Sequence, residues 1–186
     1  YNENLAKHGT WPATWFFGRQ QSYHELDIQV RAAAAGLKAF GIRPGDRVAM
    51  ALPNCPQHIA AFYAVLKLGA IVVEHNPLYT AHELEGLFQD HAARVAIVWD
   101  KMTATFEQLR ETTPLETIIS VNMTEAMPRS KQLLLRIPIP PITEQREQLT
   151  APAPNTVPWS TLTGTAIGGD GTKLADAEIH PEDTAI

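Results

Sequence analysis

The glycine-rich segment from Gly164 to Lys173 is the first candidate for chemistry, because glycines ahead of a lysine can cradle phosphate groups. A Walker loop needs four residues between its first glycine and a Gly-Lys-Ser/Thr sequence. Four residues after Gly164, however, the sequence reads Gly169-Asp170. No apolar strand precedes the segment either. The spacing therefore favours a surface loop over a phosphate site.

Cys55 and His58 are the second candidate, since a thiolate beside an imidazole can act as a nucleophile. Their separation would put both near the start of one helix, where the positive end of the helix dipole favours a thiolate. The segment is apolar, however, and supplies no third polar group. We therefore expect Cys55 to be a buried structural cysteine.

Three histidines, His75, His82 and His91, raise the question of a metal site. Their spacings of seven and nine residues put no two of them on adjacent turns of one helix, and no carboxylate pattern typical of a ligand set accompanies them. We expect polar histidines at the surface or in loops. The acidic residues of the same segment are expected on a solvated helix face: Glu83, Glu85 and Asp90.

Basic and leucine residues are interleaved between Arg129 and Arg136, with Lys131 ahead of three leucines. Such a pattern can bind a membrane surface. The segment holds only three basic residues, so a peripheral membrane contact is a secondary interpretation.

The composition excludes several classes of function. Fifteen Lys+Arg against 20 Asp+Glu leave a net charge of −5, without the basic stripe that a nucleic-acid-binding protein needs. No apolar run approaches the ~20 residues that span a bilayer. Cys55 is the only cysteine, which excludes a disulfide framework and a thiolate zinc site and indicates a cytoplasmic setting.

The elements that would position these residues alternate between helices and strands. Capping-box pairs and glycines predict where helices begin and end: Ser22 with Glu25, Thr80 with Glu83, Gly41 and Gly69. The pattern predicts a strand, turn and strand at 15–21, helices at 22–40, 54–69, 80–92 and 105–110, and strands at 48–52, 71–73, 95–98 and 117–121.

Two positions within these helices carry specific expectations. Asn54 is expected to cap the second helix, with Pro56 in its first turn, where a missing N–H costs nothing. Gly36 lies inside the first helix at a cost of about 1 kcal/mol relative to alanine. A close neighbour is the usual reason for a glycine there.

Short apolar strands that alternate with helices predict an α/β fold, with a doubly wound, mainly parallel sheet and helices on both faces. After Asn122 prolines recur, and residues 122–186 are expected to form an irregular Pro/Gly-rich tail, partly disordered or ordered only by contacts outside this chain. The predicted division is therefore an α/β subdomain at 1–121 and an irregular segment at 122–186.

The stretch from Leu66 to Thr80 resembles a block of the bacterial long-chain fatty acyl-CoA ligases, which belong to the adenylate-forming superfamily. The likeness is good over about Pro12 to Val121, weak through the proline-rich stretch and stronger again at the end. Further blocks match in register: Ser22–Leu26, Gly41–Ala49, Leu52–Asn54, Glu83–Leu84, Asp90–Val95, Trp159–Leu162 and His180–Ala185. The run Asn76–Thr80 leans towards fatty acyl substrates.

The resemblance implies a two-step reaction for the parent enzyme. A fatty acid carboxylate attacks the α-phosphate of ATP to give an acyl-adenylate and pyrophosphate, and the thiolate of coenzyme A then displaces AMP. Mg²⁺ and cationic or N–H donors would stabilise the phosphate charge.

The family's phosphate loop, ribose-binding aspartate and catalytic lysine match no residue of this chain, which ends at Ile186. We therefore assign no catalytic, cofactor-binding or metal residue. The resemblance implies a fragment, inactive alone, that supports the remainder of the parent enzyme. ATP, Mg²⁺, coenzyme A and fatty acid would be ligands of that parent.

Two alternatives stay open at this point. In one, the parent activates an aryl or amino acid instead of a fatty acid. In the other, the chain is a complete, non-enzymatic binding module. The start at Tyr1 rather than a methionine, and the family likeness that breaks off after Thr184, favour the fragment.

Overall fold

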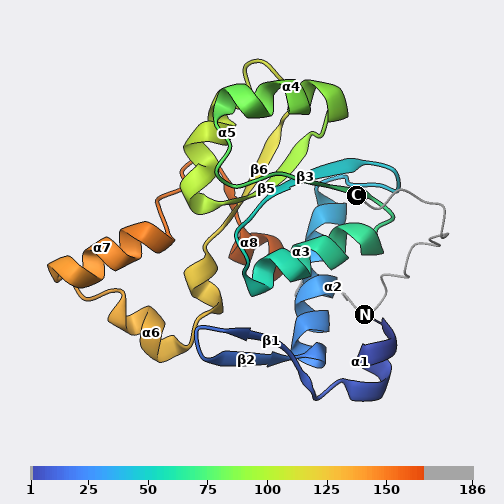
Figure 1. The fold of residues 1–186 in the computed structure, drawn as a ribbon. Coiled ribbons are helices and arrows are strands. Elements are labelled where there is room, and N and C mark those ends of the chain that lie inside the picture. Colours follow the sequence, from blue (N-terminus) through green and yellow to red (C-terminus); the bar gives the residue numbers. More distant parts are fainter. Residues whose placement is uncertain (1, 166–186) are drawn as a thin grey trace.

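In the computed structural model, which describes residues 2–165, a five-stranded sheet forms the centre of the molecule (Figure 1). Neighbouring strands are all parallel, in the order β4-β3-β5-β6-β7. Their bounds are β3 Arg47–Ala51, β4 Ile71–Glu74, β5 Val95–Trp99, β6 Thr117–Val121 and β7 Val157–Pro158. The predicted α/β fold with a parallel sheet is confirmed.

Helices cover both faces of this sheet (Figure 1). One layer consists of α2 (Tyr23–Ala39), α3 (Pro56–Lys67) and α8 (Trp159–Thr165), and the opposite layer of α4 (Ala81–His91) and α5 (Thr103–Leu109). Before them come α1 (Asn2–His8) and an antiparallel hairpin, β1 (Pro12–Phe16) with β2 (Arg19–Ser22). Two short 3₁₀ helices, η1 (Asp100–Met102) and η2 (Met123–Ala126), follow β5 and β6.

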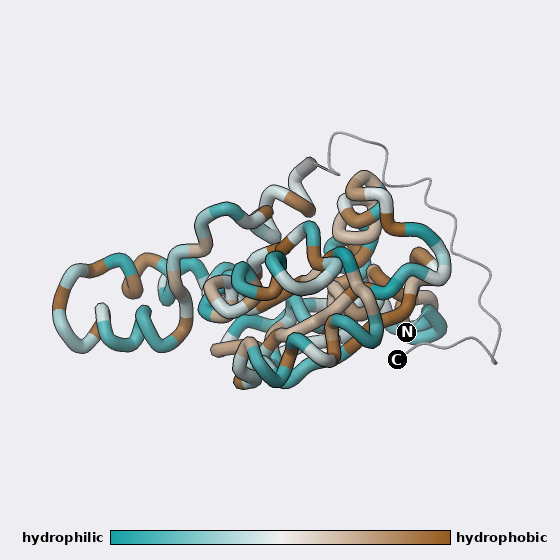
Figure 2. The backbone as a smooth tube through the Cα atoms, turned by 90° about the horizontal axis from the view of Figure 1, so that it is seen from above, coloured by the Kyte–Doolittle hydropathy of each residue, from teal (hydrophilic) through white to brown (hydrophobic). Residues whose placement is uncertain are grey.

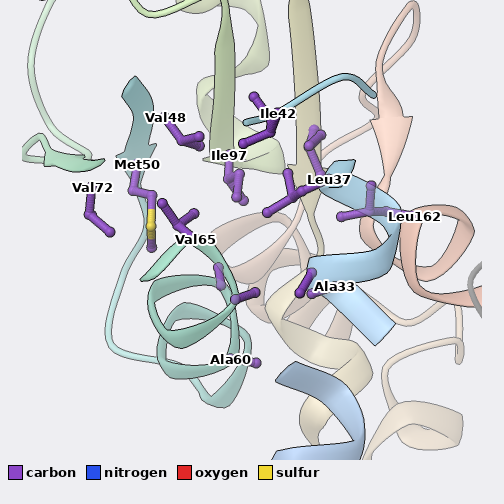
Figure 3. Packing of buried hydrophobic residues seen from close by; sticks show 14 of the residues in the cluster. Ala33, Leu37, Ile42, Val48, Met50, Ala60, Val65, Val72, Ile97 and Leu162 are labelled. Carbon is purple, nitrogen blue, oxygen red and sulfur yellow. The ribbon is translucent and has the colours of Figure 1, made fainter. Parts of the chain in front are cut away.

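Different sets of side chains pack the two faces of the sheet. Towards α2, α3 and α8, the strands present Val48, Met50 and Ile97, and the helices present alanines such as Ala33 together with larger residues such as Leu162 (Figure 3). Towards α4 and α5, the strands present alanines together with Val98 and Ile118, and the helices present Phe88 and Phe106. Alternation along each strand separates the two sets, because successive side chains point to opposite faces.

Both predicted capping boxes are present. The Ser22 N–H donates to Glu25 Oε2 (2.8 Å), and the Glu25 N–H donates to Ser22 Oγ (3.2 Å). Thr80 and Glu83 exchange the same pair of bonds at the start of α4. The N–H of Ser22 and that of Thr80 each donate to a glutamate carboxylate, and these bonds hold the pKa of Glu25 and Glu83 below its usual value.

The predicted cap of α3 is wrong by one residue. Cys55, not Asn54, is the N-cap, with extended backbone (φ −142°, ψ 160°) and no capping hydrogen bond from its side chain. Pro56 begins the helix, as expected. The proline is also the reason for the shift, because the residue before a proline is driven out of the helical region and must itself lie outside the helix.

The segment after Asn122 holds more regular structure than the irregular tail that we expected. Besides β7 and α8 it forms α6 (Arg129–Leu134) and α7 (Pro140–Leu149). The prolines occupy positions that tolerate them: Pro140 begins α7, and Pro158 lies in β7 at the edge of the sheet. The part of the expected tail from 166 onward lies outside the described residues.

The C-terminal end of α7 contacts the end of β5 and the residues that follow it. Trp99 Nε1 donates to the carbonyl oxygen of Leu149 (3.0 Å), and Lys101 Nζ donates to that of Glu147 (2.7 Å). A cation at the C-terminus of a helix satisfies its free carbonyl groups and opposes its dipole. Further on, the Thr156 hydroxyl donates to Ser120 Oγ (2.8 Å) and ties β7 to β6.

Helices α2 and α8 approach each other closely at Gly36. A Cβ atom added there would lie 2.6 Å from the carbonyl oxygen of Leu162 and 2.7 Å from its Cγ. Leu162 itself is fully buried. The expected close neighbour of this glycine is therefore the backbone of a helix more than a hundred residues later in the sequence.

Gly36→Ala should lower the free energy of unfolding by about 1–3 kcal/mol, because the new methyl group has to displace α8. The matched control is Gly86→Ala in α4, where an added Cβ meets nothing within 4 Å. That variant should stabilise the protein by about 0.5–1 kcal/mol through helix propensity. Urea denaturation measures both, and equal stability changes in the two variants would contradict the packing described.

Candidate functional site

The order of the strands indicates where a ligand would bind. The chain goes from β3 to β4 on one side and then crosses to β5 on the other, so the strand order reverses between β3 and β5. In open α/β sheets, ligands bind outside the carboxyl ends of the strands near such a switch point. We call this region, formed by the residues that follow each strand, the carboxyl edge.

Two hollows lie at the carboxyl edge, and the β1–β2 hairpin walls both. The larger, of about 480 Å³, lies between β1 and the first half of α3, and its apolar lining includes Trp15, Phe16, Ile59, Phe62 and Tyr63. The smaller, of about 190 Å³, lies between the hairpin, η2 and α8, and its polar lining includes Arg19, Gln57, Glu125 and Ser160.

His58 forms an ion pair at the rim of the larger hollow. Its Nε2 lies 2.9 Å from Oε1 of Glu74, the last residue of β4. This hydrogen bond raises the pKa of His58, and a bond to the backbone of Pro53 acts in the same direction against the effect of burial. A protonated imidazole held in this way can donate a hydrogen bond or attract an anion, but it is a poor base.

The hypothetical thiolate–imidazole pair of Cys55 and His58 is not formed, because His58 is bound to Glu74. Cys55 is buried, as expected, and burial raises the pKa of its thiol to about 11. The thiol is therefore protonated at neutral pH and is not a nucleophile.

His75 lies in a loop after β4 and His91 ends α4, but neither is at the surface. Both are buried, at 8% and 9% exposure, and their Nε2 atoms lie 3.1 Å apart. The Ala93 N–H donates to His91 Nδ1, so a neutral His91 carries its proton on Nε2 and donates it to His75. Burial lowers the pKa of both rings, that of His75 to about 4. Of the three histidines, only His82 is exposed.

Asp100 follows β5 directly and is 3% exposed. Burial raises the pKa of this carboxyl to about 6. The Thr150 hydroxyl, which donates to Oδ2, and nearby backbone N–H groups oppose this rise, because each of them lowers the pKa. Its Oδ1 has no hydrogen-bond partner. Burial, followed by the charge of Asp100, also raises the pKa of Glu125.

These residues do not combine into a catalytic set. Within residues 2–165, no group of three or more His, Cys, Asp or Glu side chains could hold a metal ion. The glycine-rich segment runs outside the described residues after Thr165. Sequence reasoning missed Glu74 and Asp100 as members of the carboxyl edge, although their positions at the ends of two strands could have identified them.

Comparison with known proteins shows similarity to one enzyme family and to several ligases. A family model described as "AMP-binding enzyme" matches residues 1–186. The chain is 35% identical over 119 residues to the long-chain-fatty-acid–CoA ligase of Bacillus subtilis (strain 168), which covers 64% of this chain and 21% of that protein. It is 31% identical over 136 residues to the long-chain-fatty-acid–CoA ligase of Escherichia coli O157:H7, covering 73% and 24%. The chain thus spans less than a quarter of these relatives.

A shorter match, 38% identical over 81 residues, is to the 2-hydroxy-7-methoxy-5-methyl-1-naphthoate–CoA ligase of Streptomyces carzinostaticus, and covers 44% of this chain and 14% of that protein. Among solved structures, the anthranilate CoA ligase AuaEII in complex with anthranoyl-AMP superposes with a TM-score of 0.76 at 21% identity, over 98% of this chain and 29% of that one. The coronafacic acid ligase from Pectobacterium brasiliense gives 0.71 at 22% identity, over 99% and 31%. At these identities the structures show a shared fold.

Glu74→Gln should lower the pKa of His58, because it removes the carboxylate that holds the proton. A raised pKa in the folded state stabilises the protein below the unfolded value, and this contribution is lost as the pH rises through the folded value. The variant should therefore lose stability at acidic pH and little at alkaline pH. NMR titration of His58 measures the shift. Glu116→Gln, in the exposed pair with Arg94, should leave His58 unchanged, and an unaltered His58 pKa in Glu74→Gln would refute the pairing.

The His75–His91 pair should make the protein less stable between pH 6.5 and about 4. In that range the unfolded state binds protons that the folded state excludes, so the free energy of unfolding falls as the pH falls. His75→Gln keeps an acceptor for His91 but does not titrate, and it should flatten this dependence. Urea denaturation at several pH values measures it. His82→Gln, at an exposed position, is the control, and the account fails if both variants keep the wild-type slope.

Proposed function

Because this chain belongs to the AMP-binding enzyme family, we propose that it forms one α/β subdomain of a longer, ATP-dependent acyl-CoA ligase that acts on a fatty acid. The observation that carries the proposal is the identity of 35% and 31% to two long-chain-fatty-acid–CoA ligases. The block from Leu66 to Thr80, which carries the resemblance in the sequence, includes Gly69 with a positive φ and Thr80 as the cap of α4.

The proposed reaction has two balanced steps. A carboxylate oxygen of the fatty acid forms a bond to the α-phosphorus of ATP, and pyrophosphate leaves with the electrons of the broken P–O bond. The sulfur of coenzyme A then attacks the acyl carbon, and AMP leaves. Both steps need groups that stabilise the charge on phosphate oxygens.

We assign none of residues 2–165 to that stabilisation. They hold no carboxylate or histidine cluster for a metal ion, and the buried, protonated Cys55 and the neutral His75–His91 pair offer no charge to a phosphate. We therefore route neither step through them. The proposed role of this subdomain is structural: its carboxyl edge, with an apolar hollow of about 480 Å³, presents a wall to the remainder of the enzyme.

An aryl acid is the second candidate for the substrate of the longer enzyme. The match to the naphthoate–CoA ligase, at 38% identity over 81 residues, favours it. That match covers less of this chain than the matches to the fatty-acid ligases, 44% against 64% and 73%. The fatty acid is therefore the first proposal.

ATP–pyrophosphate exchange with a fatty acid present tests the proposal. The purified 186-residue chain should be folded by circular dichroism and give no exchange, because its described residues hold no cluster for a metal ion and we assign none of them to the phosphates. A longer protein that contains this chain should give exchange that depends on the fatty acid. Exchange by the 186-residue chain alone would contradict the scaffold role.

A panel of carboxylates on the longer protein separates the two substrate classes. Long-chain fatty acids should support exchange at least ten times faster than benzoate, anthranilate or amino acids, which is roughly 1.4 kcal/mol of discrimination. Preference for an aryl acid would support the second candidate and overturn the first.

A further inference from the structure

Residues 129–149 form a projection that we call the arm. It consists of α6, α7 and the link between them, and it extends from the body of the molecule on the left of both views (Figures 1 and 2). Among residues 2–165, in the arm or elsewhere, no helix is long and apolar enough to cross a membrane. Neither α6 nor α7 contains a buried residue. The position of the arm therefore depends mainly on contacts at its two ends.

The first end of the arm is fixed beside α6. Leu135, directly after α6, is 7% exposed, and Met127, two residues before it, is 2% exposed. Gln132 Nε2 donates to the carbonyl oxygens of Met127 (2.8 Å) and Glu125 (3.1 Å). The chain is therefore held against the body as far as Leu135.

The second end is held by three consecutive residues where β5 ends. Trp99 Nε1 and Lys101 Nζ donate to carbonyl oxygens in the last turn of α7. Between them, Asp100 accepts a hydrogen bond from the Thr150 hydroxyl, directly after α7. We call this set of contacts the latch.

Asp100 is the member of the latch that is costly to bury. It is 3% exposed, and its Oδ1 has no hydrogen-bond partner. A buried carboxylate oxygen without a donor loses its hydration and gains nothing in return. The Thr150 hydroxyl and the backbone N–H groups of Lys101 and Ala151 therefore compensate only part of the lost hydration. If the latch opened, water could reach both oxygens of the carboxylate.

Contacts on either side limit how far such an opening can spread. Beyond the latch, the Thr156 hydroxyl lies 2.8 Å from Ser120 Oγ and 2.7 Å from the carbonyl oxygen of Ala153, and β7 pairs with β6. On the other side, the buried Leu135 holds the chain. The segment that can move without disturbing the core is therefore 136–151, which includes all of α7.

From this arrangement we propose that the latch is a switch, which opens while the sheet and the helices packed on it stay folded. Opening releases α7 and the residues up to Ala151, and the arm then changes its position about two fixed ends. It also exposes Asp100 to water. The inference is independent of the reaction and of the substrate proposed above.

Protonation of Asp100 favours the closed latch. Burial raises the pKa of Asp100 to about 6 from its ordinary value of 3.8, which a hydrated carboxyl in the open latch would keep. The closed state therefore binds a proton between these two values, and opening becomes rarer as the pH falls. From pH 7 to pH 5 the opening equilibrium should decrease roughly tenfold.

Three charged residues of the described chain lie near Asp100. The charge of Lys101 lowers the pKa of Asp100 but is outweighed by burial. Glu125 belongs to η2, and its own pKa is raised by burial and then by the charge of Asp100. Glu147 is exposed on α7, beside the carbonyl group that Lys101 binds.

Native-state hydrogen exchange of the 186-residue chain tests the switch. The backbone amides of α7 and of Ala151 should exchange through a local opening, faster than the amides of β5. After correction for intrinsic exchange rates, this opening should be roughly tenfold rarer at pH 5 than at pH 7. The inference is overturned if these amides exchange only together with β5, or if their opening does not depend on pH in this range.

Four variants separate the latch from other titrating groups. Asp100→Asn keeps an acceptor for Thr150 but cannot titrate, so the opening should be as rare at pH 7 as at pH 5. Trp99→Phe removes one hydrogen bond and no titrating group, so it should increase the opening roughly fivefold at every pH. Glu125→Gln should keep the pH dependence, because burial is the largest cause of the shift at Asp100.

Glu147→Gln, at an exposed position of α7, is the matched control and should exchange as the wild type does. An NMR titration of the Asp100 carboxyl carbon should give a midpoint near 6. A pH dependence that survives in Asp100→Asn, or that disappears in Glu125→Gln or Glu147→Gln, would assign the titration to another group and overturn the inference.

Discussion

The close packing of α2 against α8 is the interaction on which the rest of the structure depends. It exists because Gly36 has no side chain where the backbone of Leu162 passes. With α8 in place, Leu162 fills the core between the sheet and α2, and Trp159 and Ser160 wall the smaller hollow at the carboxyl edge. Helix α8, the last helix that the structure describes, is therefore part of the same core as α2.

Local signals in the sequence were sufficient for four strands of the sheet, β3 to β6, and for the helices between them. The capping boxes at Ser22 and Thr80 and the short apolar strands predicted element positions to within a few residues. The segment after Asn122 was predicted poorly, because prolines were read as breaks in structure. At Pro140 and Pro158 they instead occupy a helix start and an edge strand, where the missing N–H costs nothing.

The carboxyl edge was harder to predict, since its polar residues gain their properties from partners distant in sequence. Glu74 and Asp100 can be located from the strands they follow, but the raised pKa of Asp100 depends on burial by a segment that includes Thr150. The His75–His91 contact needs the end of β4 and the end of α4 to meet. In each case the polar atoms contact other parts of the scaffold and form no catalytic set, which agrees with the proposed role as one subdomain of a longer enzyme.

We infer that residues 2–165 form one cooperative unit, closed by α8, with the fold of the AMP-binding enzyme family. Native-state hydrogen exchange of the 186-residue chain tests it most directly, by comparing the backbone amides of α8 with those of α2. We predict that both helices exchange only through global unfolding, with the same free energy. Rapid exchange in α8 beside slow exchange in α2 would contradict the claim, because the core would then be closed without it.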